Sequence, residues 1–251
     1  MNGLPVSWKR RLTDRYILRR TDTVVALSHA EREFLTRGQG IAPHRVAVIP
    51  NGILTSVFDR VHCEPSNDLL FVGQLQDFKG LDYLLDAMPA VHRSFPLAKL
   101  RIVYQTAARL DRYKAQATRL GLIGTVNFAG PRAPADLARL YSSAAAVISP
   151  SLGECLSTVV LEAMCCGAAV VATDVGGIRE QLDESTGIIV PPRNPDALAR
   201  AICSMLADGN RRRQLGEAAR RKAHTQFTVR KMIDRHVRLY EELLYTDERA
   251  A

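Results

Sequence analysis

Two glutamates, Glu154 and Glu162, stand eight positions apart, where a bound ligand could use both of them. Glu154 lies in a serine- and glycine-containing segment, residues 150–157, which predicts a loop. Glu162 interrupts an apolar stretch of helical period, residues 158–164. A carboxylate buried in such a stretch is costly unless donors bond to it, and ligand hydroxyl groups would be such donors. The alternative interpretation is a charge at a helix start together with a locally paired glutamate.

A lysine and several glycines make the neighbouring segments suitable for binding an anion. Lys79 lies near the end of a second glycine-containing loop, residues 73–80, and two further loops of this kind span residues 130–132 and 174–177. Glycine lets the main chain approach a ligand, and the helix that follows such a loop turns its free N–H groups toward it. With a lysine, these N–H groups suit a phosphate. Glycine and proline that merely close turns are the alternative for any one loop, whereas four loops at one sheet edge favour a binding site.

The elements that must position these residues follow from the hydrophobic pattern. Short runs rich in β-branched residues alternate with longer segments of helical period, which is typical of βαβ units. The predicted fold class is α/β, a doubly wound parallel sheet, in which ligands bind beyond the carboxyl ends of the strands. The predicted strands are residues 23–27, 46–49, 68–72, 100–104, 125–129, 146–149, 169–173 and 187–190, and the predicted helices are residues 80–94, 107–120, 134–143, 157–166, 177–182, 195–207, 210–225 and 229–244.

The composition is that of a globular protein, with 251 residues of which 47% are hydrophobic and 24% charged. A net charge of +8 favours an anionic partner or substrate over a cationic one. The five cysteines include no CxxC pair, which argues against a disulfide framework or a zinc site and predicts a reducing, cytoplasmic location. No apolar run approaches the roughly 18 residues of a membrane span, and no signal peptide is predicted.

The segment around the two glutamates resembles a known family. Residues 150–164, continued by Gly167, residues 170–173 and Gly176-Gly177 to Glu180, resemble the glycosyltransferase group 1 family, whose members are retaining, nucleotide-sugar-dependent enzymes of the GT-B fold. Other segments resemble the family in the same order, and the resemblance covers nearly the whole chain. They are the last strand and serine of its first domain at residues 24–28, the interdomain linker at 48–53, the opening of the second domain at 71–80 and the closing helix at 229–244.

The resemblance implies a role for each matching residue. Glu162 would hold the ribose hydroxyls of the donor nucleotide, and Glu154 would contact the transferred sugar as a positioning group and not as a nucleophile. Lys79 would neutralise the departing diphosphate, so neither a metal nor a cofactor is expected. The implied catalytic residues are Glu154 and Lys79, and the implied donor-binding residues are Gly73, Gln74, Gly130, Cys155, Leu156, Ser157, Thr158 and Glu162, with the N–H groups of residues 156–158 binding the sugar hydroxyls and the diphosphate.

The chain departs from the family pattern at several places. Gln74 stands where the family usually has arginine, five residues before the lysine, which leaves more of the diphosphate charge to Lys79. Residues 104–106 replace a Gly-x-Gly, and Tyr104 either stacks on a base or, as we expect, packs in the core. Residues 155–157 replace the common Gly-Phe-Gly, and no histidine matches the catalytic histidine of the family's first domain.

The pattern and the resemblance together divide the chain into three parts. Residues 1–52 hold only two predicted strands, too few for an independent sheet domain, and we expect them to be a remnant of the family's N-terminal domain with its linker. Residues 53–227 are expected to form the Rossmann-like donor-binding domain, and residues 228–251 the closing helix. An exposed apolar seam is expected near Ile53 and along that helix.

Two hypotheses of function remain. In the first, the chain is the donor-binding half of an enzyme that transfers a sugar from a nucleotide-diphosphate sugar to an unknown acceptor with retention, while a partner chain supplies the N-terminal domain. In the second, it is a nucleotide-sugar-binding module or remnant without activity of its own; an epimerase of the same fold fits less well. Interleaved basic and apolar residues over 8–20 suggest peripheral docking on anionic lipid, with solvated charge as the alternative. No nucleic-acid module is predicted.

Overall fold

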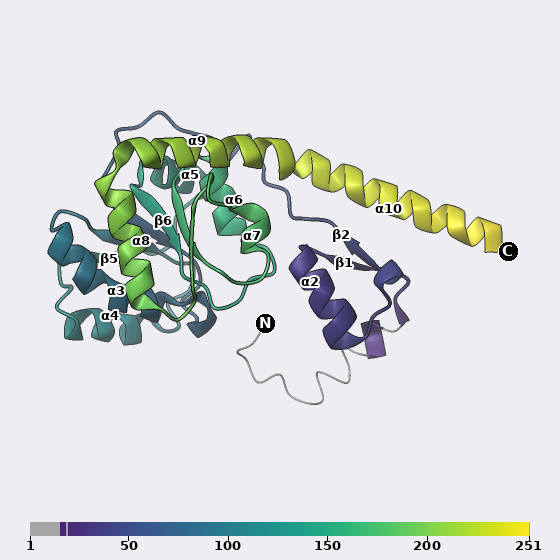
Figure 1. Cartoon of the computed structure of the whole chain (residues 1–251), viewed down its shortest axis with the longest axis horizontal. Helices are drawn as coiled ribbons and strands as arrows, with labels where there is room; N and C mark the ends of the chain where they lie inside the picture. The colour runs from purple at the N-terminus through teal and green to yellow at the C-terminus, as the bar shows by residue number, and fades with distance from the viewer. Residues whose placement is uncertain (1–15, 19, 251) are drawn as a thin grey trace.

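The computed structural model describes residues 16–18 and 20–250, and its main body is a six-stranded sheet (Figure 1). All neighbouring strands pair in parallel, in the order β5-β4-β3-β6-β7-β8. In the central strand, Leu69 is in register with Leu100 on one side and with Ala146 on the other. The strands are β3 (Leu69–Val72), β4 (Leu100–Val103), β5 (Val126–Phe128), β6 (Ala146–Ser149), β7 (Val170–Thr173) and β8 (Ile188–Val190). The predicted doubly wound fold is confirmed.

Helices cover both faces of this sheet, because successive side chains of a strand point to opposite faces. In β3, Leu69 and Phe71 join one buried core with α3, α4 and α8, whereas Leu70 joins a second core with α5, α6 and α7. All residues of β6 and β7 are buried, as expected of parallel strands covered on both sides. The helices are α3 (Leu81–Ser94), α4 (Leu110–Arg119), α5 (Pro134–Ser143), α6 (Thr158–Cys165), α7 (Ile178–Gln181), α8 (Pro195–Ala207), α9 (Gly209–Gln226) and α10 (Val229–Ala250).

The strand order reverses between β3 and β6. The chain runs outward from β3 through β4 to β5, returns to β6, and runs outward again through β7 to β8. The carboxyl ends of β3 and β6 therefore flank the crevice in which open parallel sheets bind ligands. Two loops leave these strands, residues 73–80 (the β3 loop) and residues 150–157 (the β6 loop). The predicted catalytic residues Lys79 and Glu154 are thus carried to one crevice.

Residues 20–49 form a smaller N-terminal lobe. Strand β1 (Val24–Ala26) pairs in parallel with β2 (Val46–Val48), in a sheet separate from the main one. Between them lies the short helix α2 (His29–Glu33), which continues into a π-helical turn at Phe34–Gly38. Figure 1 shows this lobe beside the main body, with α2 on the side that faces it. The two predicted strands are present, whereas α2 was not predicted because its five residues carry no apolar period.

The linker meets the end of the main body at one short bridge. The Ile53 N–H donates to the Phe227 carbonyl at 2.7 Å, and the Val229 N–H donates to the Ile53 carbonyl at 3.2 Å. A side chain at Gly52 would place its Cβ 2.5 Å from the Val229 Cα. Ile53 is only 5% exposed. The bridge packs Ile53 itself into the core beside Phe227, whereas Leu54 is 53% exposed and Val57 38%, so these two residues form the exposed apolar seam expected near Ile53.

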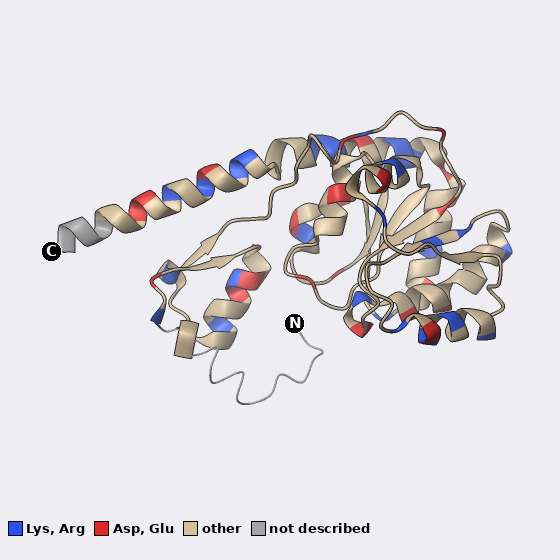
Figure 2. Ribbon diagram, turned by 180° about the vertical axis from the view of Figure 1, so that it is seen from behind, with Lys and Arg blue, Asp and Glu red and all other residues tan. Residues whose placement is uncertain are grey.

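Beyond the bridge, α10 extends as a long helix away from the main body (Figure 1). The predicted apolar seam is present on this helix. Its side chains, spaced three and four residues apart, share one face and are between 48% and 68% exposed: Ile233, Val237, Tyr240 and Leu244. Figure 2 shows Lys and Arg interspersed with Asp and Glu along the same helix. The face is therefore apolar but set within a helix of mixed charge.

Membrane contact was a separate prediction, made for residues 8–20. Most of that segment lies outside the described residues, so docking on lipid stays a prediction. Within the described part of the chain, no helix is long and apolar enough to cross a bilayer.

Candidate functional site

The β3 and β6 loops are packed directly against each other. Gly80 ends the β3 loop with a φ of +68°, and a Cβ added to it would lie 1.9 Å from the Pro150 carbonyl oxygen. The Leu152 N–H donates to the Phe78 carbonyl at 2.7 Å, which ties the two loops together through the main chain. Only glycine allows this approach, because the left-handed conformation and the close carbonyl both exclude a side chain. The crevice wall is therefore one continuous surface made from two loops.

Lys79 and Glu154 form an ion pair on this surface. The Lys79 Nζ lies 2.6 Å from the Glu154 Oε1, and the two side chains are 20% and 11% exposed. The Ser151 hydroxyl donates to the same Oε1 at 2.8 Å, a contact that the sequence did not indicate. The structure thus brings together the two residues predicted to be catalytic. An anion that binds here would compete with Glu154 for the lysine.

Glu162 projects from α6 toward Tyr141 of α5. The Tyr141 hydroxyl donates to the Glu162 Oε2 at 2.7 Å, and Tyr141 is fully buried. Burial raises the pKa of the Glu162 carboxyl, and the hydrogen bond from Tyr141 opposes that rise. The glutamate is therefore locally paired, as the alternative interpretation held. Within the described residues, however, only Oε2 receives a hydrogen bond, so Oε1 is free to accept one from a ligand.

The N-terminus of α6 corrects one prediction. Ser157 caps the helix, since its hydroxyl accepts from the Val160 N–H at 3.4 Å. The Ser157 N–H, expected to bind the donor, is instead taken by the Gln181 Oε1 at 3.0 Å, while the Gln181 Nε2 donates to the Ser157 carbonyl at 2.8 Å. Leu156 is buried and Thr158 is exposed. Because the first N–H groups of a helix have no partner inside the helix, Thr158 remains the stronger candidate for an anion contact.

Cys155 is oriented toward the N-terminal lobe. Burial, followed by a hydrogen bond with the Glu31 side chain, raises the pKa of its thiol to about 12. Its carbonyl accepts from the Gly177 N–H at 3.1 Å. Through this carbonyl, Cys155 links the β6 loop to the start of α7. Donor binding by Cys155 stays a prediction.

The remaining predicted residues lie at different distances from the ion pair. Gly73 is beside it, since a Cβ there would lie 3.9 Å from the Lys79 Cδ. Gln74 is exposed in the same loop. Gly130 follows β5, the edge strand two positions from β3, and nothing lies within 4 Å of its added Cβ. Tyr104 is only 9% exposed and belongs to the core, which supports its packing role.

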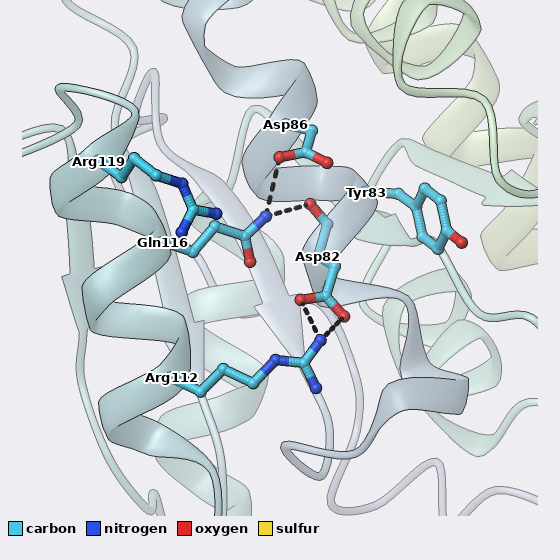
Figure 3. A pocket seen from close by; sticks show the side chains of 6 residues that line it. All are labelled: Asp82, Tyr83, Asp86, Arg112, Gln116 and Arg119. Atoms are coloured by element: carbon cyan, nitrogen blue, oxygen red, sulfur yellow. Dashed lines mark hydrogen bonds and ion pairs between the residues drawn. The ribbon is translucent and has the colours of Figure 1, made fainter.

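A surface hollow of about 400 Å³ lies elsewhere, between α3 and α4 (Figure 3). Arg112 and Gln116 point from α4 toward α3, where they bond Asp82 and Asp86. Four of the six lining side chains thus bond one another, and Arg112 also pairs with Asp77 of the β3 loop at 2.6 Å, so the hollow adjoins that loop. Among the described residues, no group of three His, Cys, Asp or Glu side chains is arranged to hold a metal ion.

Known proteins similar to this chain match it along most of its length. Residues 56–222 match the family described as glycosyl transferases group 1, and residues 3–52 match the glycosyl transferase 4-like domain. The D-inositol 3-phosphate glycosyltransferase of Segniliparus rotundus is 31% identical over 229 residues, covering 86% of this chain and 51% of that protein. The protein of the same name from Kineococcus radiotolerans is 32% identical over 242 residues, covering 85% and 56%. The chain spans about half the length of these curated relatives.

Solved structures share the fold. Sucrose-phosphate synthase from Thermosynechococcus elongatus superimposes with a TM-score of 0.89 at 28% identity, covering 98% of this chain and 64% of that one. A crystal structure of Anabaena HepE in complex with UDP and glucose gives a TM-score of 0.85 at 23% identity, covering 94% and 68%. At 23% identity, the similarity to HepE shows a shared fold.

Proposed function

The chain belongs to the glycosyl transferases group 1, and on that basis we propose that it binds a nucleotide-diphosphate sugar and supplies the donor-binding half of a retaining glycosyl transfer. The observation that carries the proposal is the Lys79–Glu154 pair, 2.6 Å apart, at the crevice where the strand order reverses. A cation and a carboxylate held there match a ligand with both a diphosphate and hydroxyl groups.

Each group has a task that its surroundings support. Lys79 and the N–H groups at the start of α6 would take the diphosphate, because both present positive charge to one crevice. Glu154, released from the lysine, would accept hydrogen bonds from hydroxyls of the sugar. Glu162 would use Oε1 for the ribose while Tyr141 holds Oε2. Gln74 would donate a hydrogen bond to the phosphates without adding charge.

In the transfer, the acceptor would attack the sugar on the same face from which the diphosphate departs. The bond from the anomeric carbon to the diphosphate oxygen breaks, the bond to the acceptor oxygen forms, and the acceptor proton passes to the departing phosphate. Negative charge grows on the leaving diphosphate, and Lys79 stabilises it in a partly buried site where charge interactions are strong. Glu154 positions the sugar and forms no covalent bond to it. We propose that neither a metal nor a cofactor is needed.

The acceptor and the partners belong to the same proposal. The relatives' name specifies D-inositol 3-phosphate, and the chain's net charge of +8 suits an anionic acceptor of that kind. We therefore place D-inositol 3-phosphate first among acceptors to test. A partner chain that completes the N-terminal side of the crevice, peripheral contact with a membrane and a cytoplasmic location are further parts of the proposal.

Calorimetry with UDP, GDP, ADP and their sugar conjugates tests donor binding. At least one diphosphate should bind, and Lys79→Ala should weaken it about tenfold or more, as expected for a lost charged hydrogen bond. The matching nucleoside, which has no phosphate, should be affected less. Lys114→Ala on the exposed side of α4 is the control and should change neither. Failure of every nucleotide to bind, or equal losses for nucleoside and diphosphate, would contradict the assignment.

A nucleotide-sugar-binding module without activity of its own is the second candidate, and the Lys79–Glu154 pair supports its donor binding equally. Both candidates predict donor binding. A transfer assay with radiolabelled donor separates them, provided that the N-terminal side of the crevice is supplied. Transfer only in the presence of a partner chain supports the half-enzyme, and binding without transfer under any such condition supports the module.

A further inference from the structure

Glu180, on the short helix α7, bonds to the N-terminal lobe with both carboxylate oxygens. The His29 N–H donates to its Oε2 at 3.0 Å, and the Ala30 N–H donates to its Oε1 at 3.1 Å. These two N–H groups open α2 and have no partner inside that helix. A carboxylate at this end also interacts favourably with the helix dipole. One side chain of the main body therefore caps the helix of the other lobe.

Two more contacts place α2 against the same part of the main body. Ser28, the N-cap of α2, is fully buried, and a Cβ added to Gly177 would lie 2.8 Å from the Ser28 Cβ. The Glu31 side chain, which helps to raise the pKa of the Cys155 thiol, accepts from the Leu27 N–H at 2.7 Å. The start of α2 is thus held by side-chain hydrogen bonding and by close packing at once.

The position of α7 connects this contact to the β6 loop. A Cβ added to Gly176 would lie 1.5 Å from the Glu154 carbonyl oxygen, and the Gly177 N–H donates to the Cys155 carbonyl at 3.1 Å. The β6 loop and the two glycines that precede α7 are consequently in direct contact. A displacement of the Glu154 main chain must displace α7, and Glu180 with it.

We infer that Glu180 is a positioning residue that fastens α2 to the β6 loop and so fixes the N-terminal lobe beside Glu154. Its consequence for sugar transfer rests on the proposed function, whereas the contact itself does not. Through α7, a nucleotide bound at Lys79 and Glu154 stabilises the hydrogen bonds at the start of α2. The lobe is thereby held against α7 and the β6 loop that α7 contacts.

Hydrogen exchange of the free protein tests the contact without ligand or activity. In Glu180→Ala, the amides of His29 and Ala30 should exchange about tenfold to a hundredfold faster, because each loses a charged acceptor. Glu180→Gln keeps one acceptor oxygen and should restore part of the protection. Glu184→Ala removes an exposed carboxylate just beyond α7 and is the control. Exchange in Glu180→Ala within twofold of that control would overturn the inference.

A second arm separates the positioning role from a merely structural one. With the tightest-binding of UDP, GDP and ADP, exchange at the start of α2 should slow at least threefold in the wild type and should not change in Glu180→Ala. The nucleotide Kd should stay within twofold in that variant, since Glu180 is not a donor contact. A bound nucleotide without effect on α2 in the wild type would overturn the connection through α7. If no nucleotide binds, the proposed function fails, while the free-protein exchange still decides the contact.

Discussion

Replacing Gly80 by alanine should force the two loops of the crevice apart. The left-handed conformation, with φ at +68°, costs a non-glycine residue about 1–2 kcal/mol. In addition, the new Cβ would lie 1.9 Å from the Pro150 carbonyl, and the atoms must separate by about 1.1 Å to reach the 3.0 Å below which such contacts are essentially never seen. That shift breaks the Leu152–Phe78 hydrogen bond, a further loss of about 1 kcal/mol.

The matched control is Gly121→Ala. Gly121 has nearly the same φ, +71°, but nothing lies within 4 Å of its added Cβ. It should therefore lose only the conformational part, about 1–2 kcal/mol. We expect Gly80→Ala to lose about 2–3 kcal/mol of unfolding free energy, because the loss of the hydrogen bond is added. Urea denaturation followed by far-UV circular dichroism measures the unfolding free energy of both variants, with the same dependence on urea concentration assumed for each.

Nucleotide affinity gives the second measurement on the same pair. Gly80 follows Lys79 directly, so a displaced loop moves the lysine away from Glu154, and diphosphate binding should weaken at least tenfold in Gly80→Ala but not in Gly121→Ala. Equal stability losses in the two variants, with unchanged affinity in both, would refute the claim that the two loops form one rigid wall.

Other changes probe single groups of the site. Glu162→Ala should weaken nucleotide binding by about 1.5–3 kcal/mol in calorimetry, with free base unaffected, because the lost contact is to ribose; unchanged affinity in a folded variant would remove Glu162 from the site. Tyr141→Phe removes the hydrogen bond that opposes the raised pKa of Glu162, so that pKa should rise further. A carboxyl whose pKa is higher in the folded than in the unfolded state lowers the unfolding free energy of the protein as pH rises. The difference in unfolding free energy between wild type and Tyr141→Phe, measured by urea denaturation, should therefore be largest at neutral pH and shrink toward acidic pH. Gln74→Arg should tighten diphosphate binding, and no gain would mean that the β3 loop directs this side chain elsewhere. These 251 residues alone should bind donor without transferring sugar to D-inositol 3-phosphate, and robust transfer by the isolated monomer would falsify the half-enzyme hypothesis.

The sheet and its crevice could be predicted from the sequence because both depend on local pattern. β-branched runs buried on two faces, such as residues 146–149 and 170–173, remain recognisable without any partner in view. Lys79 and Glu154 follow two of these runs, and parallel strands bring their ends to the same edge. The ion pair between them therefore follows from topology, once the resemblance has singled out the two residues.

The contacts that complete the site could not be predicted, because they join side chains far apart in the sequence. Tyr141 lies 21 residues before Glu162, and Gln181 lies 24 residues after Ser157. Neither has a motif of its own. The Ser157 N–H was wrongly assigned to the donor for this reason, since a free helix-start amide is the default until a distant side chain is placed on it. Glu180 was part of the resemblance, yet its target on α2 was not foreseen.

The bridge between Ile53 and the end of α9 is one point at which the segment leading to the N-terminal lobe is attached to the main body. The linker at Gly52 and the start of α10 meet at this bridge, so both segments leave the main body at the same point. An attachment at one point leaves every rotation about that point open, and the second attachment, at Glu180, opposes the rotations that would carry α2 away from the main body. The N-terminal lobe is thereby held at two separate points, and because a Cβ at Gly52 would lie 2.5 Å from the Val229 Cα, any side chain at position 52 would disrupt the first of them.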